Sequence, residues 1–112
     1  MSNKRFFRIP MSELRVSLPK LRHKVQFNKC SIVCTRNGET AAFLLSLHDA
    51  AVLQIDAQKS EELSLTEFRQ TLTEAWEKLQ DGTDCIYLTF HNRRVVAFVS
   101  DRIAGNLAGG VS

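Results

Sequence analysis

The second half of this chain repeats the first at a constant spacing of 54 residues, and this repetition limits the folds that the chain can adopt. Ser12-Glu-Leu-Arg15 and Thr66-Glu-Phe-Arg69 show the spacing most clearly. Without any gap, 10 of the 47 pairs between residues 7–53 and 61–107 are identical, where chance would give about three. A gapless alignment of this length indicates the tandem duplication of one unit.

Both repeats predict the same order of elements: a strand, a long helix, a hairpin and a short final helix. Ser12 and Thr66 are the predicted N-caps of the long helices. Pro19 predicts an interruption of the first helix, with a new segment capped by Ser17, whereas Thr73 at the equivalent position allows one straight helix. Apolar residues three and four apart predict the buried helix faces, namely Leu14, Leu18, Leu21 and Val25, then Phe68, Leu72, Ala75 and Leu79.

Each predicted hairpin has its own turn sequence. Arg36-Asn37-Gly38-Glu39 lies between apolar runs and is typical of a type I′ turn, in which both central residues have positive φ. Phe90-His91-Asn92-Arg93 is its counterpart, where Asn92 can adopt the left-handed conformation. Ser46 and Ser100 follow the hairpins and are predicted to cap short helices. Short strands are predicted before the long helices, at residues 6–9 and 62–65.

We therefore predict an α+β fold with two tandem β-α-β-β-α units, residues 1–54 and 61–107, and a polar linker at 55–60. A unit of this size buries too little apolar surface to be stable alone. The two units are expected to form a single-chain pseudo-dimer around an antiparallel sheet, with the hairpins joined in one sheet or packed across an approximate two-fold axis. The alternative is two separate units that each dimerise with another chain. A homodimer of the whole chain also stays open.

Basic residues are concentrated in the first repeat. Residues 1–54 contain nine Lys and Arg against three Asp and Glu, whereas residues 55–112 contain six against nine. This asymmetry favours a polyanionic partner for one half, although charge also scatters unevenly by chance. No stretch approaches the roughly 20 apolar residues of a membrane span, and the N-terminus lacks the pattern of a secretory leader. With only three cysteines, Cys30, Cys34 and Cys85, a cytoplasmic location is expected.

Three segments of the first repeat occur together in a characteristic order: Ile9-Pro-Met-Ser-Glu-Leu-Arg15, Val33-Cys-Thr-Arg-Asn-Gly-Glu39 and Ala42-Phe-Leu-Leu-Ser-Leu-His-Asp49. In this order the first repeat resembles the N-terminal, DNA-binding domain of Phd/YefM-type antitoxins. The resemblance implies dimerisation through this domain, binding of operator DNA with two-fold symmetry, repression of the protein's own operon, and neutralisation of a toxin through a flexible tail. In this chain the second repeat follows where that tail would begin.

The resemblance implies that Arg15 and Arg36 contact DNA, with Arg69 as the second-repeat counterpart of Arg15. A guanidinium group can hold a phosphate or read a guanine edge. Phe90 takes the place of Arg36 in the second repeat. The other candidate DNA-binding residues are Asn37, Arg93, Arg94 and Arg8. For each arginine the alternative is a solvated surface side chain.

Catalytic or metal-binding chemistry finds little support in the sequence. His23, His48 and His91 lie in different predicted elements, and Cys30 and Cys34 do not have the spacing of a zinc site. No phosphate loop or dinucleotide fingerprint is present. We expect no catalytic residue, metal or cofactor, and we expect that the protein is not an enzyme.

The sequence therefore predicts a DNA-binding transcriptional regulator, an antitoxin-like repressor that binds duplex DNA through the arginines of the first repeat. The alternative is a protein-interaction module that binds a toxin or another regulator and has lost DNA binding. Trp76, which replaces Arg22 in the second repeat, is either a core residue or part of such a partner-binding surface.

Overall fold

Six strands form one mixed sheet in the order β1-β2-β3-β6-β5-β4 in the computed structural model, which describes residues 6–28 and 30–109. The edge strands β1 and β4 run parallel to their neighbours, and all other pairings are antiparallel. The predicted α+β class is confirmed. The sheet was expected to be antiparallel, but it is mixed. The strands are β1 Phe6–Pro10, β2 Ser31–Arg36, β3 Glu39–Ser46, β4 Ser60–Ser64, β5 Cys85–Phe90 and β6 Arg93–Ser100.

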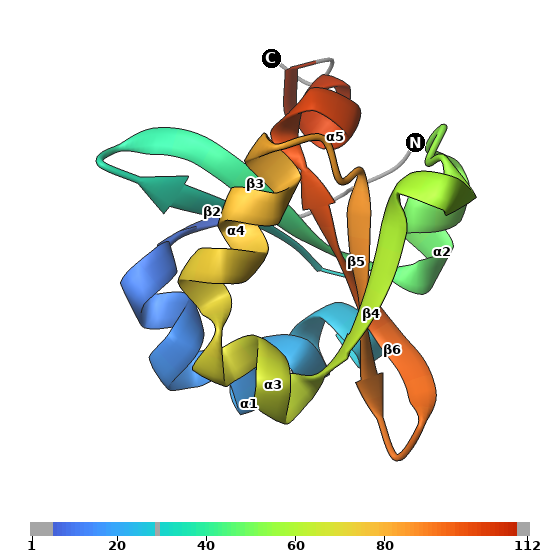
Figure 1. Cartoon of the computed structure of the whole chain (residues 1–112). Helices are drawn as coiled ribbons and strands as arrows, with labels where there is room; N and C mark the ends of the chain where they lie inside the picture. The colour runs from blue at the N-terminus through green and yellow to red at the C-terminus, as the bar shows by residue number, and fades with distance from the viewer. Residues whose placement is uncertain (1–5, 29, 110–112) are drawn as a thin grey trace.

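Helices cover both faces of the sheet (Figure 1). Successive strand residues point to opposite faces, and so the buried residues fall into two clusters. The larger cluster joins α1, α3 and α4 to one face, and the smaller joins α2 and α5 to the other. No helix in residues 6–28 and 30–109 is long and apolar enough to cross a membrane. The helices are α1 Met11–Asn28, α2 Leu47–Ala51, α3 Leu65–Gln70, α4 Leu72–Gln80 and α5 Asp101–Gly109, with a 3₁₀ turn, η1, at Ala57–Lys59.

The strands follow the spacing of the sequence repeat. β4, β5 and β6 begin and end 54 residues after β1, β2 and β3. The hairpins of the two repeats join through the antiparallel pairing of β3 with β6, in which Leu44 lies opposite Phe98. The expectation that both hairpins combine in one sheet is therefore met, and the two repeats do not fold as separate units.

Each long helix begins two residues earlier than its predicted N-cap implies. Ser64, not Thr66, caps α3: its hydroxyl accepts the Glu67 N–H at 3.1 Å, and the Glu67 carboxylate accepts the Ser64 N–H at 3.3 Å. This reciprocal pair is a capping box, which satisfies two free N–H groups of the first turn. Ser12 likewise lies inside α1, which begins at Met11. The predicted N-caps Ser12 and Thr66 are therefore wrong by two positions.

Both long helices are interrupted at equivalent positions. Ser17 has the non-helical angles φ −103° and ψ 15°, as Pro19 predicted. The second repeat was expected to have a straight helix, but Thr71 breaks it with φ −120° and ψ 35°, which separates α3 from α4. The Thr71 hydroxyl donates to the Glu67 carbonyl at 2.7 Å, a type of bond that bends helices. A proline is therefore not needed for this break.

The turns have the predicted backbone conformation. Asn37 and Gly38 have φ of 55° and 82°, and His91 and Asn92 have φ of 53° and 62°, so both turns place two successive residues in the left-handed region. The strand predicted at residues 62–65 lies instead at Ser60–Ser64. The predicted caps are confirmed, because Ser46 accepts the Asp49 N–H at 3.1 Å and Ser100 accepts the Ile103 N–H at 3.3 Å.

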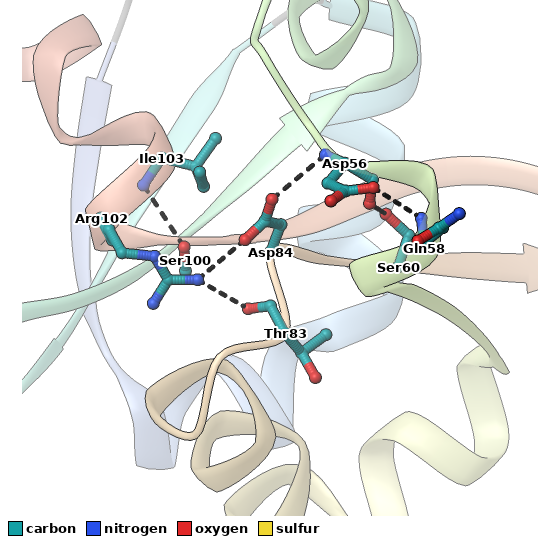
Figure 2. A network of polar contacts seen from close by, with 8 residues as sticks. All are labelled: Asp56, Gln58, Ser60, Thr83, Asp84, Ser100, Arg102 and Ile103. Atoms are coloured by element: carbon teal, nitrogen blue, oxygen red, sulfur yellow. Dashed lines mark hydrogen bonds and ion pairs between the residues drawn. The ribbon is translucent and has the colours of Figure 1, made fainter.

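The predicted linker, residues 55–60, is ordered by Asp84 (Figure 2). The buried Asp84 carboxylate accepts the Asp56 N–H at 3.1 Å and pairs with the Arg102 guanidinium at 2.8 Å. The Asp84 N–H in turn donates to the Lys59 carbonyl at 2.7 Å. One carboxylate therefore joins the segment between the repeats to α5.

Candidate nucleic-acid interface

Arg15 and Arg69 occupy equivalent positions in the two repeats and line the same hollow in the surface. Arg15 lies in the first segment of α1 and Arg69 near the end of α3, and both are exposed. Together with Thr66 and Gln70 they line a hollow of about 500 Å³, which we call the central hollow. Two arginines that are 54 residues apart in the sequence therefore face one space.

The placement of these arginines follows from the residue that precedes each of them. Leu14 and Phe68 are fully buried in the larger core cluster. The next residue on a helix is rotated by about 100°, so Arg15 and Arg69 point to solvent while their neighbours anchor the helices. α1 follows the edge strand β1 and α3 follows the opposite edge strand β4, yet side chains of both helices line the same hollow.

The guanidinium groups of the central hollow have no anionic partner among the residues that the structure describes. Among residues 6–28 and 30–105, neither Arg15 nor Arg69 makes an ion pair or a side-chain hydrogen bond. Glu67, the carboxylate two residues before Arg69, accepts a hydrogen bond from the Ser64 backbone instead. Both arginines are thus free to bind an external anion such as a phosphate, with charge-assisted hydrogen bonds.

A second hollow of about 180 Å³ adjoins the central hollow and shares Thr66 and Arg69 with it. We call it the side hollow. It adds a third arginine, Arg22, and an apolar lining between α1, α3 and the second hairpin. Its other lining residues are Leu18, Pro19, Leu65 and Phe90.

Arg36 and Asn37 lie at the tip of the first hairpin and do not line either hollow. The Arg36 guanidinium carbon lies 4.3 Å from the centre of the Trp76 ring, at a distance typical of a cation–π contact. Asn37 supplies the first left-handed residue of the turn. The two hairpins project in different directions from the sheet (Figure 1), and so the predicted hairpin residues do not gather at one point.

The remaining predicted arginines differ in their surroundings. Arg94 forms an ion pair with Glu62, and its guanidinium lies 4.0 Å from the centre of the Tyr87 ring. Arg93 is exposed at the start of β6, and Arg8 is exposed on the edge strand β1. Among the predicted DNA-binding arginines that the structure describes, Arg94 is therefore the one whose charge is paired with a carboxylate of the chain. Lys4 and Arg5, the basic residues that precede Arg8 in the sequence, lie outside the described residues.

Comparisons with known proteins give no relative. No protein-family model, curated protein or solved structure matches this chain. The function of the chain is therefore inferred from its own residues, and the likeness to Phd/YefM-type antitoxins stays a prediction.

Sequence reasoning missed the contribution of Arg22, which is not among the candidate DNA-binding residues. Its guanidinium carbon lies 4.7 Å from the centre of the Phe90 ring, and its Nη1 donates to Gln26 at 2.9 Å. The signal was present in the repeat, because the replacements of Arg22 by Trp76 and of Arg36 by Phe90 each exchange an arginine for an aromatic residue. Considered one at a time, the two replacements did not indicate a contact.

Two of the three cysteines have strongly shifted acidity. Burial raises the pKa of the Cys34 thiol to about 12 and also raises the pKa of the Cys85 thiol to about 12. Both thiols are therefore protonated at neutral pH, and a protonated thiol is a poor nucleophile and a poor metal ligand. Cys34 packs in the larger core cluster.

Proposed function

We propose that this chain binds duplex DNA as a transcriptional regulator and that Arg15 and Arg69 form the centre of the contact. The observation that carries the proposal is the central hollow, where equivalent arginines from the two repeats face one open space. A pair of cations related in this way suits a duplex, because operator symmetry mirrors the symmetry of the protein that binds it.

The proposal includes the arrangement of the repeats as a single-chain counterpart of a dimer. Three observations support it: the strands repeat at 54 residues, the sheet order is β1-β2-β3-β6-β5-β4, and the equivalent residues Leu44 and Phe98 lie opposite each other where the repeats meet. In a dimer of a Phd/YefM-type domain the resemblance implies two identical chains, whereas here one chain would supply both halves.

Other residues of the predicted set would contribute at the margins of the contact. Arg36, Asn37 and Arg93 are exposed at the two hairpins and would meet the DNA backbone on either side of the central hollow. Arg8 would add charge from the edge strand. We assign Arg94 a structural role, because its ion pair with Glu62 already compensates its charge.

The test is a fluorescence anisotropy titration of a labelled random duplex at low and at physiological salt. Arg15→Ala and Arg69→Ala should each weaken binding about tenfold, and the double variant about a hundredfold, because a charged hydrogen bond contributes about 1.5–3 kcal/mol. The matched control is Lys59→Ala, which removes one exposed cation at the end of η1, just before β4. A double variant that binds as tightly as Lys59→Ala would refute the proposal.

A protein-interaction module is the second candidate function. It is favoured by the cation–π contact of Arg36 and the ion pair of Arg94, which engage two predicted DNA-binding arginines within the chain. If the wild-type chain fails to bind duplex DNA even at low salt, this second function replaces the first. A small toxin gene adjacent to the gene for this chain would then indicate the class of the protein partner.

A further inference from the structure

Two contacts between the repeats are exchanged versions of each other. In one, Arg36 of the first hairpin lies over Trp76 of α4, at 4.3 Å from the ring centre. In the other, Phe90 of the second hairpin lies against Arg22 of α1, at 4.7 Å. Positions 36 and 90 are equivalent in the repeat, and so are positions 22 and 76. Each contact joins the hairpin of one repeat to the long helix of the other, but the cation and the ring have changed sides.

We infer that four side chains determine which repeats can pack together, namely Arg22, Arg36, Trp76 and Phe90. They favour the second repeat as the partner of the first and disfavour a pairing of two first repeats. A pairing of two first repeats would bring Arg36 against Arg22 at both contacts, with two like charges and no ring. A pairing of two second repeats would bring Phe90 against Trp76, with no cation. Only the unlike pairing places a guanidinium on an aromatic face at both contacts.

The surroundings of the four residues support a selective role for the rings. Arg22 and Arg36 form no ion pair among the described residues. Besides the hydrogen bond from Arg22 to Gln26, each guanidinium group has an aromatic face as its neighbour. The Trp76 Nε1 atom is buried and has no hydrogen-bond partner among those residues, so the indole contributes through its face. Tryptophan provides the strongest cation–π contact of the aromatic residues.

The other two cation–π contacts among the described residues cannot select a partner, because each lies within one repeat. Lys24 lies 5.3 Å from the centre of the Phe7 ring in the first repeat, and Arg94 lies over Tyr87 in the second. Position 24 is again a lysine in the second repeat, where Lys78 pairs with Glu61 at 2.8 Å. Lys24 and Lys78 therefore keep the cation at the same position of both repeats, whereas the two contacts between the repeats exchange the cation and the ring.

The surface of the first repeat therefore fits a partner that offers an aromatic side chain on the second part of its long helix and another at its hairpin. In this chain that partner is the second repeat. The inference does not depend on DNA binding, because it concerns only which surfaces of the repeats accept one another.

The experiment places the first-repeat residues at the equivalent positions of the second repeat in the full-length chain. Trp76→Arg with Phe90→Arg gives both repeats arginine at the helix and the hairpin position, so that each contact becomes an arginine pair. We expect the unfolding equilibrium constant, measured by urea denaturation and far-ultraviolet circular dichroism, to shift toward the unfolded state by about a hundredfold, since each lost cation–π contact and each new repulsion adds to the effect. Circular dichroism is required because Trp76 is the only tryptophan.

The decisive variant exchanges all four residues, Arg22→Trp, Arg36→Phe, Trp76→Arg and Phe90→Arg. This chain again has one cation and one ring at each contact, and it should recover to within about fivefold of the wild-type equilibrium constant. Recovery is expected even if the doubly substituted chain does not fold at all. The inference is overturned if the four-residue exchange is no more stable than the doubly substituted chain, or if the doubly substituted chain unfolds at the wild-type urea concentration.

Discussion

Leu44 of β3 lies directly opposite Phe98 of β6 at the middle of the pairing between the two repeats. Both side chains are fully buried in the larger core cluster. The Phe98 ring packs edge-on against the Phe68 ring, with 4.8 Å between the ring centroids. The equivalent positions therefore hold different side chains that share one space. The pairing of β3 with β6, where the two repeats meet, is therefore part of the core of the whole molecule.

Phe98→Ala should lower the free energy of unfolding by about 3–5 kcal/mol, because it removes a fully buried ring and leaves a cavity. Urea denaturation measures this change. Val52→Ala is the matched control, since Val52 is 69% exposed and its truncation should change the free energy by less than about 0.5 kcal/mol. Equal changes in the free energy of unfolding for the two substitutions would contradict a core that continues from one repeat into the other.

The salt dependence of DNA binding should report the arginines of the central hollow. The slope of log Kobs against log salt concentration changes by about 0.9 for each phosphate that a cation neutralises. Arg15→Ala and Arg69→Ala should each reduce the magnitude of the slope by about one, whereas Arg94→Ala should leave it nearly unchanged, because Glu62 already pairs with Arg94. A larger change for Arg94→Ala than for Arg15→Ala would place the contact on the second hairpin instead.

Asp84 should make the protein sensitive to acid. Burial alone would raise the pKa of this carboxyl group, but the hydrogen bond and charge of Arg102 and the hydrogen bond from Asp56 outweigh it and lower the pKa below the usual 3.8. A lowered pKa contributes stability that is complete above the unfolded value and is lost as the pH falls through the folded value. The contribution of Asp84 should therefore begin to decrease at about pH 4 and decrease further as the pH falls through the lowered pKa of the folded protein.

Asp84→Asn tests this prediction. At neutral pH the substitution should cost about 1–3 kcal/mol of unfolding free energy, because it weakens the bonds that hold Asp56 and Arg102. Below about pH 3 the difference from wild type should shrink. Asp81→Asn, an exposed aspartate three residues earlier, is the control and should change the profile little. Parallel profiles for wild type and Asp84→Asn in unfolding experiments across this range would contradict the assignment.

Two glycines should respond to alanine in opposite directions. Gly38 has φ of +82° in the first hairpin turn, and an L side chain there costs about 1–2 kcal/mol. Gly105 lies inside α5, where alanine is favoured by up to about 1 kcal/mol, and its added Cβ would meet only the exposed Asp101 side chain at 3.1 Å. Thermal unfolding should show a lower Tm for Gly38→Ala and an equal or higher Tm for Gly105→Ala; a lowered Tm for both would mean that Asp101 cannot move aside.

Local sequence patterns predicted much of the secondary structure. The apolar spacing of the long helices, the left-handed turn at Asn37 and Gly38 and the serine caps at Ser46 and Ser100 are all present. These features depend on residues within four positions of one another. The errors were also local: Thr71 breaks the second helix without a proline, and Ser64 competes successfully with Thr66 as the cap because Glu67 lies three residues after it.

The candidate site was only partly predictable. Arg15 and Arg69 were identified from the repeat and the family resemblance, but no pattern indicated that they would face one hollow. The contacts of Arg36 with Trp76 and of Arg22 with Phe90 join residues from different repeats. Such contacts depend on how β3 pairs with β6, which brings together segments that are about half the chain apart.

The sequence by itself determined the repeating unit, the order of its elements and the helix and strand faces that are buried, since these follow from short-range periodicity and backbone preferences. Only the tertiary structure decided which side chains of the two repeats meet. A strand register and a packed interface are set by the complementarity of two complete surfaces, and neither surface can be described from its own segment alone. The exchanged arginines and rings became a pair of contacts only when the two hairpins were joined in one sheet.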